Sequence, residues 1–305
     1  MSRLALPSAL ACLALFAAFE AAAQPAAPPT PVPTVTTVGA NLNISPKRVT
    51  FDRNRRSATV YIYNQGTSAA TFDIGLVDRV MTPEGQIVAV SDVASRPELK
   101  PMSDRLASAQ GMLLASPRRA TLAPGQGQTI RLRVGNLPEG ANGEYRTHLT
   151  ITTIPPADSG ITAEAAAAGA PDELRFQINS VFGLSIPAII RAGDPDVRAA
   201  IENARIEHAD ISPDGVAPAR RTPVMAFDLV RQGANSLFGN IEIKPSGQRR
   251  GDPIGLARGV GVYTEIDRRT VRIPLSREPA AGEKLEITFT DDDTSPGKLL
   301  ATTVP

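Results

Sequence analysis

The chain has one cysteine, Cys12, in 305 residues. Cys12 lies in an apolar N-terminal segment that we expect to be removed, so the mature chain would have no thiol. Disulfides, cysteine-ligated metals and thiol chemistry are therefore excluded. The remaining chain must be stabilised by cores large enough to form unaided, and its length of roughly 280 residues fits two domains.

Neither sign of charge predominates, with 32 basic against 31 acidic residues. Such a chain has no net field to attract nucleic acid or an anionic membrane, so no nucleic-acid partner is expected. The two histidines, His148 and His208, have no second histidine or cysteine at ligand spacing. We expect His148 on the solvent-facing phase of its strand and His208 at a strand end or in a loop.

Sequence signatures of catalysis are also missing. No Gly-x-Ser-x-Gly elbow, phosphate loop or dinucleotide fingerprint occurs. Asp291 to Asp293 lack the spaced glycine and distal glutamate of a calcium loop, and we interpret them as a solvated charge run. The prediction is a protein that is not an enzyme, with no catalytic residues, no cofactor and no metal.

The N-terminus has the three parts of a secretory signal. Arg3 precedes the apolar run Leu4 to Phe19, and Ala21-Ala22-Ala23 supplies the small residues of a cleavage site. An uncleaved membrane anchor is the alternative, but the run is short for a span. A lipoprotein modified at Cys12 is disfavoured because the apolar run continues past it. We expect a signal peptide over residues 1–23, then a Pro-rich leader over 24–39, and no membrane span after cleavage.

Short runs in which apolar and polar residues alternate recur between residues 40 and 188, separated by Gly and Pro turn signals. This pattern predicts an antiparallel, immunoglobulin-like β-sandwich. Between Val90 and Ala109, prolines limit any helix to a turn or two. The alternating apolar sets are Val60 and Ile62; Phe72, Ile74 and Leu76; Ile130, Leu132 and Val134; and Tyr145, Thr147, Leu149 and Ile151.

Residues 194–305 repeat the pattern, with a boundary marked by Pro187 and the segment 192–195. We expect a second, smaller sandwich, so the fold class is all-β with two tandem immunoglobulin-like domains. Its alternating sets are Met225, Phe227 and Leu229; Ile241 and Ile243; Val260 and Val262; Val271 and Ile273; and Leu285, Ile287 and Phe289.

Three segments of the first domain resemble periplasmic pilus (fimbrial) chaperones of the chaperone-usher pathway, as a divergent subgroup. They are ISPKRVTFD at 44–52, ASPRRATLAPGQ at 115–126, and 137–156 from LPEG to IPP. The resemblance implies two sandwiches in a boomerang arrangement, with pilin subunits and an outer-membrane usher as partners. It also implies donor-strand complementation, in which an incomplete subunit borrows a chaperone strand.

One apolar strand fits that role independently of the resemblance. Its apolar side chains share one phase, interrupted only at Ser180, and an exposed edge strand of this kind invites aggregation unless a partner covers it. The alternative is that these residues pack inside their own sandwich, above all those next to the domain boundary. The predicted donor residues are Leu174, Phe176, Ile178, Phe182 and Leu184, followed by Ile186.

Arg48 occupies the position at which the resemblance implies an arginine that binds the subunit's C-terminal carboxylate. A guanidinium pairs with a carboxylate through two parallel hydrogen bonds. Without the resemblance, Arg48 would be interpreted as a surface residue beside Lys47. The family's second anchor is a lysine, expected near Phe182 or Gly183, and no lysine occurs between Glu173 and Ile190. Arg175 or another basic residue would have to replace it.

The predicted function is a periplasmic chaperone that caps pilus subunits and delivers them to an usher. A secreted or surface-exposed structural or adhesive protein is the alternative, and an exported enzyme or metal carrier lacks the clusters it would need. The sequence leaves open which subunit is bound, and whether the free protein is a monomer or a homodimer that covers its own strand.

Overall fold

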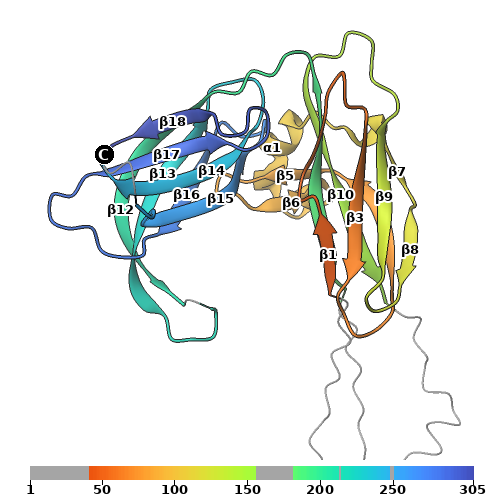
Figure 1. The fold of residues 1–305 in the computed structure, drawn as a ribbon. Coiled ribbons are helices and arrows are strands. Elements are labelled where there is room, and N and C mark those ends of the chain that lie inside the picture. The colour runs from red at the N-terminus through yellow and green to blue at the C-terminus, as the bar shows by residue number, and fades with distance from the viewer. Residues whose placement is uncertain (1–40, 156–180, 213, 248–250) are drawn as a thin grey trace, which may run out of the picture.

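The computed structural model describes residues 41–155, 181–212, 214–247 and 251–305. The expected signal peptide and leader lie outside these residues, as do Leu174, Arg175, Phe176 and Ile178. The described residues form two β-sandwiches in tandem, with few helical turns (Figure 1). The all-β prediction of two immunoglobulin-like sandwiches is therefore confirmed.

The first sandwich packs a four-stranded sheet against a five-stranded one, with strand orders β1-β3-β9-β7 and β2-β11-β10-β4-β8. All pairings are antiparallel except that of β2 with β11. In sheet order, the strands are β1 (Leu42–Ser45), β3 (Ser57–Asn64), β9 (Gly127–Val134), β7 (Leu113–Ser116), and then β2 (Val49–Phe51), β11 (Gly183–Ala192), β10 (Gly143–Ile154), β4 (Ala70–Val77) and β8 (Arg119–Leu122).

The core of this sandwich follows from the period-two pattern, because alternate side chains of a strand point to the same face. Val60 and Ile62 of β3 are fully buried, and Val60 lies opposite Ile130 of β9. From the other sheet, Ile151 of β10 lies opposite Ile74 of β4. Side chains from both sheets belong to one apolar cluster, so the alternation identified in the sequence is what holds the two sheets together.

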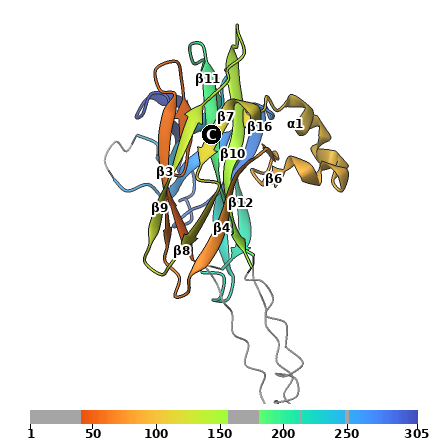
Figure 2. The same ribbon diagram turned by 90° about the vertical axis from the view of Figure 1, so that its right-hand side faces the viewer.

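The segment between β4 and β7 leaves the first sandwich and packs against the second. Met81 joins the apolar core of the second sandwich, and the Thr270 amide donates to the Pro83 carbonyl at 2.9 Å. The short helical turns expected between Val90 and Ala109 are present, and Figure 2 shows α1 projecting beside the strands. The elements are β5 (Arg79–Met81), β6 (Ile87–Ala89), η1 (Val90–Ala94), η2 (Pro97–Leu99), α1 (Lys100–Arg105) and η3 (Gln110–Met112).

The second sandwich pairs the sheet β12-β13-β16 with the sheet β15-β14-β17-β18. Phe227 and Phe289 are fully buried in its core. In sheet order, the strands are β12 (Ala199–Ile211), β13 (Arg220–Arg231), β16 (Arg268–Pro274), and then β15 (Gly255–Val262), β14 (Leu237–Pro245), β17 (Leu285–Asp291) and β18 (Leu299–Thr303). The alternating runs of the sequence account for five of these strands, whereas β12 and β18 were not anticipated.

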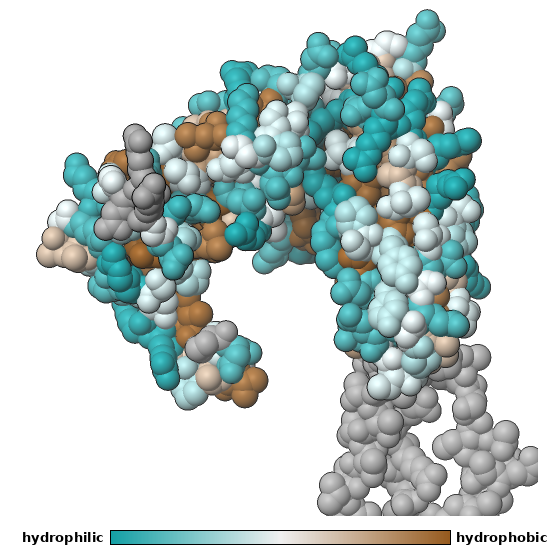
Figure 3. Space-filling view, viewed as in Figure 1, coloured by the Kyte–Doolittle hydropathy of each residue, from teal (hydrophilic) through white to brown (hydrophobic). Residues whose placement is uncertain are grey.

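The two sandwiches meet at one end and diverge at a steep angle, so a hollow lies between them (Figures 1 and 3). Strand β1 lines the hollow on the side of the first sandwich. None of the helices in the described ranges is both long and apolar enough to span a bilayer.

Gly239 marks a close approach in the second sandwich. A Cβ at this position would lie 2.1 Å from the Thr290 carbonyl oxygen and 2.9 Å from the Phe289 ring. We expect Gly239→Ala to destabilise the protein by about 1–3 kcal/mol, because an added methyl would force backbone apart. Gly75→Ala is the control, since no atom lies within 4 Å of a Cβ there. Urea unfolding of both variants tests this, and equal midpoints would contradict the packing.

Candidate functional site

The carboxylate of Asp293 connects the two sandwiches. Arg48 donates to its Oδ2 from Nε at 3.2 Å and from Nη2 at 3.0 Å. Nη2 of Arg191 lies 2.9 Å from the same oxygen, and the Thr50 hydroxyl donates to Oδ1 at 3.1 Å. The Arg48 and Asp293 side chains are 7% and 12% exposed, so two guanidiniums of the first sandwich hold one largely buried carboxylate of the second.

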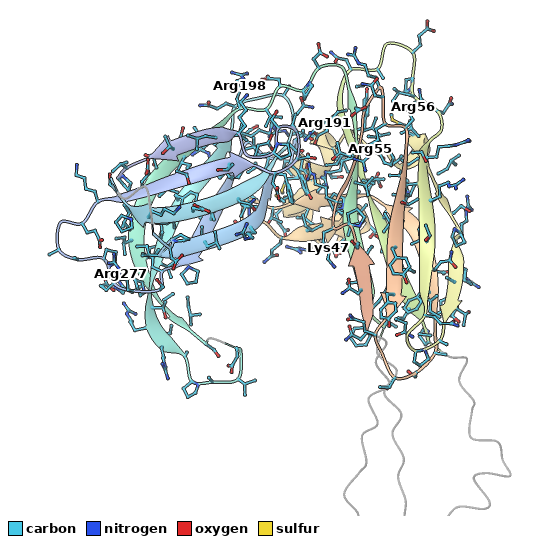
Figure 4. The ribbon with its side chains drawn as sticks, viewed as in Figure 1. Lys47, Arg55, Arg56, Arg191, Arg198 and Arg277 are labelled. Atoms are coloured by element: carbon cyan, nitrogen blue, oxygen red, sulfur yellow. The ribbon has the colours of Figure 1, made fainter. Side chains whose placement is uncertain are left out.

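Each member of this group is placed by a different local feature. Arg48 immediately precedes β2, and Arg191 lies near the end of β11, where Figure 4 labels it at the junction of the sandwiches. Asp293 lies in the loop after β17, which Asp291 shapes by accepting the amides of Asp293 at 3.1 Å and Ser295 at 2.6 Å. The interpretation of Asp291 to Asp293 as a solvated charge run is therefore wrong, because Asp291 shapes a turn and Asp293 pairs with arginines.

Charge compensation at Asp293 exceeds the cost of its burial. Burial by itself raises the pKa of this carboxyl, but Arg48, Arg191 and the hydrogen bond from Thr50 together hold the pKa below its usual value of 3.8. Glu144 provides a second acid for Arg191, accepting from its Nε at 3.0 Å and from the Ser236 amide at 3.1 Å. Asp293 therefore stays ionised and paired at neutral pH.

A second ionic cluster lies on β10. Arg146 donates to the Glu265 carboxylate, which also accepts the Met81 amide at 2.7 Å, and both side chains of this ion pair are at most 1% exposed. The Arg146 guanidinium lies 4.0 Å from the centre of the Tyr263 ring. These contacts join β10, the β5 strand and the turn before β16, so they tie the inserted segment and both sandwiches together.

His148 also belongs to this cluster, and the prediction that it faces solvent is wrong. It is 2% exposed, and its Nδ1 lies 3.4 Å from Nη1 of Arg146. Burial and the neighbouring arginines, Arg146 first, lower its pKa from 6.5 to about 2, so it is neutral. The alternation placed His148 correctly on the outer face of its sheet, but the second sandwich rather than water covers that face.

Arg48 lies in the junction with most of its donors occupied. Its Nη2 also donates to the Ser236 hydroxyl at 3.2 Å, and its guanidinium lies 4.7 Å from the centre of the Phe238 ring. Its Nη1 is buried without a hydrogen-bond partner among the described residues. A carboxylate from another molecule would reach Arg48 by replacing Asp293, so the anchor role of Arg48 stays a prediction.

At its far end the first sandwich opens into an apolar groove. The described part of the predicted donor strand lies here: Phe182 is 46% exposed, Leu184 is partly buried against the core, and Ile186 is 3% exposed. Two hydrogen bonds hold Phe182 beside Thr153. The Phe182 amide donates to the Thr153 hydroxyl at 2.8 Å, and the Thr153 amide donates to the Phe182 carbonyl at 2.9 Å. The groove has a volume of about 340 Å³ and is lined by Asn41, Leu42, Phe72, Ile151, Thr153, Phe182, Gly183 and Leu184.

Two strand edges border this groove without a described neighbour. Strand β1 is the last strand of its sheet and pairs only with β3 among the described residues. Strand β2 covers β11 only from Ala188 to Ile190, so within the described ranges residues 183–187 pair with β10 alone. These edges leave backbone donors and acceptors available for another strand.

Sequence reasoning missed Glu144, Arg146, Arg191, Glu265 and Asp293, which form the junction. The sequence does carry a signal for Arg191. It directly follows the apolar run from Ile186 to Ile190, and an arginine next to buried residues usually has a charged partner. Arg191, next to Arg48, is a second cation at the junction; Arg175 lies outside the described residues. Among the described residues no group of three or more His, Cys, Asp or Glu side chains is arranged to hold a metal ion.

No protein-family model matches the chain, and no curated protein matches it. Its structure is similar to that of the E. coli chaperone DraB, at 11% identity and a TM-score of 0.42, over 87% of this chain and 96% of that one. It is similar to the SafB chaperone in complex with the Salmonella enterica SafA pilin, at 12% identity and a TM-score of 0.40, over 89% and 98% of the two chains. It is also similar to the chaperone–tip adhesion subunit pre-assembly complex CsuC–CsuE of Acinetobacter baumannii, at 14% identity and a TM-score of 0.39, over 87% and 98%. At these identities and TM-scores the likeness concerns the fold and carries no argument about function.

Arg146→Met tests the buried ion pair at the junction. Removal of one partner leaves the Glu265 carboxylate buried without its counter-charge, so we expect a loss of about 3–5 kcal/mol. Arg119→Met is the control, because its ion pair with Asp73 is 65% and 54% exposed and such pairs contribute about 0–1 kcal/mol. Calorimetry of both variants is the measurement, and a similar small loss in both would show that Arg146 is not a structural tie.

Proposed function

We propose that this protein is a periplasmic chaperone that captures exported, β-rich pilus subunits by strand addition and passes them to an outer-membrane usher. The observation that carries the proposal is the apolar groove at the open end of the first sandwich, bordered by two strand edges. The Phe182 side chain lines this groove and is 46% exposed. It lies on the same phase of the strand as the buried Ile186. An unfinished edge of this kind suits a partner strand better than water.

Capture would combine backbone and side-chain contacts. Residues 183–187 of β11 supply the backbone edge, because a strand added beside β11 extends the sheet β2-β11-β10-β4-β8. Phe182 and Leu184 supply apolar surface, and complete burial of such a side chain contributes about 1.5–3 kcal/mol. The donor residues Leu174, Phe176 and Ile178, outside the described residues, would lengthen this contact. Release to the usher follows when a strand of another subunit takes the place of β11.

The ionic junction would set the geometry for capture. Asp293 holds Arg48 and Arg191 together across the two sandwiches, which keeps the hollow beside β1 at a defined width. A subunit carboxylate would take the place of Asp293 on Arg48, while Asp293 keeps its contact with Arg191 and so still joins the two sandwiches. Arg191 is then the proposed second cation, in place of the lysine that is missing between Glu173 and Ile190.

Phe182→Asp tests the donor edge. The charge would have to be buried against the subunit, so we expect capture to fall at least a hundredfold. Val181→Asp is the matched control, because Val181 is 58% exposed and lies one residue away on the opposite phase. Titration against purified subunits encoded beside this gene measures both, with melting temperatures as the check on folding. Equal affinities of the two variants would contradict the donor assignment.

The carboxylate anchor is tested with a double-mutant cycle. Peptides that match the subunit's C-terminal strand are made as free acid and as amide, and each is titrated against the wild type and Arg48→Ala. We expect the wild type to prefer the acid about tenfold and Arg48→Ala to bind both alike, because a charged hydrogen bond contributes about 1.5–3 kcal/mol. A preference for the acid that survives in Arg48→Ala would remove Arg48 from this role.

A further inference from the structure

Strands β12 and β13 extend beyond their sheet as a two-stranded arm. β16 accompanies β13 only as far as Val224, opposite Pro274. The β12–β13 pairing continues outward from His208 opposite Pro223 to Ile211 opposite Arg220. We call the described residues 208–212 and 214–223 the arm, and residues 214–219 its tip.

Contacts with the second sandwich hold the base of the arm, and hydrogen bonds within the turn shape its tip. At its base the Leu275 amide donates to the Pro223 carbonyl at 2.8 Å, and His208 Nε2 lies 3.1 Å from the Glu278 carboxylate. At the tip the Asp214 carboxylate accepts the amides of Val216 at 2.9 Å and Ala217 at 2.7 Å. Gly215 has a φ of 78°, which a β-branched residue would adopt only with strain. The turn is therefore shaped by local contacts, and among the described residues no third strand pairs with this part of the ribbon.

The tip presents apolar side chains beside one exposed carboxylate, that of Asp214. Val216 is 90% exposed, and Pro218 and Ala219 beside it are exposed as well. The polar groups of the turn are used internally, since the Ser212 hydroxyl donates to the Ala217 carbonyl at 2.7 Å. An isolated two-stranded ribbon is only marginally stable in water, so a projection that ends in valine gains stability when a partner covers it.

The tip lies on the same hollow as the capture edges. Figure 1 shows the arm curving from the second sandwich toward the side on which β1 lies, and Figure 3 shows apolar surface at its end across the hollow from the first sandwich. A β-rich subunit seated on the edges of β1 and β11 would occupy the space between them and the arm. It would present to the arm the side turned away from the first sandwich.

We infer that the tip of the arm is a second contact for the captured subunit and binds an apolar patch on its outer face. This inference rests on the proposed function. The arm would limit how far a bound subunit pivots on the donor edge, because two separated contacts fix an orientation that one strand leaves free.

The experiment uses residues 24–305, the chain expected after signal cleavage, which contain no cysteine. Val216→Cys, labelled with a maleimide photocrosslinker, is mixed with the purified subunits encoded beside this gene. Leu299→Cys is the matched control, since Leu299 is 54% exposed on β18, away from the hollow. In parallel, Val216→Asp and a variant in which residues 212–219 are replaced by Asn-Gly are titrated against the subunit. The Asn-Gly turn suits the last pair, Ile211 with Arg220.

We expect crosslinks to the subunit from position 216 but not from position 299. Both arm variants should bind the subunit about tenfold more weakly than the wild type, with unchanged melting temperatures. If both arm variants bind the subunit with wild-type affinity and position 216 gives no crosslinks, the arm contact is overturned. The donor edge is then still tested separately by Phe182→Asp. Crosslinks to a second copy of this chain would also overturn it. A wild type that binds no subunit would overturn the proposed function and the arm contact together.

Discussion

One carboxylate shared between two arginines is the constraint on which the rest of the structure depends. Asp293 belongs to the second sandwich, and Arg48 and Arg191 belong to the first, so the sandwiches separate only if buried charges lose their partners. The Arg146–Glu265 pair adds a second buried tie nearby. Because the sandwiches are joined at one end only, the strand edges and apolar groove at the opposite end of the first have no neighbour among the described residues.

Much of the fold was predictable because each sandwich core depends on a local pattern. The alternation of Val60 and Ile62, or of Ile287 and Phe289, identifies both the strand and the face that becomes buried. The helices after Val90 are short, as expected from the prolines there, which limit a helix to a turn or two. β12 was not predicted, since its edge position leaves it mostly polar and half-exposed, without the apolar phase that marks a buried strand.

The site was less predictable because its residues are defined by contacts between distant parts of the chain. His148 lies on the face that alternation assigns to solvent, and only the docking of the second sandwich buries it. The group of Arg48, Arg191 and Asp293 joins positions whose spacing in the sequence carries no periodic signal. By contrast, the shared phase of Phe182 and Leu184 was predictable, since a strand phase is a local property, and their donor role stays a prediction.

The most direct test of the account is amide hydrogen exchange of the mature protein, with and without a purified subunit. If the subunit adds a strand at the open end of the first sandwich, amides of β11 between Gly183 and Ile186 gain protection, and those of Leu42–Ser45 in β1 follow if the subunit spans both edges. Amides of β14, which pairs with a strand on each side, serve as the internal reference. Binding that protects another surface, and leaves the exchange of β11 unchanged, would contradict the central claim.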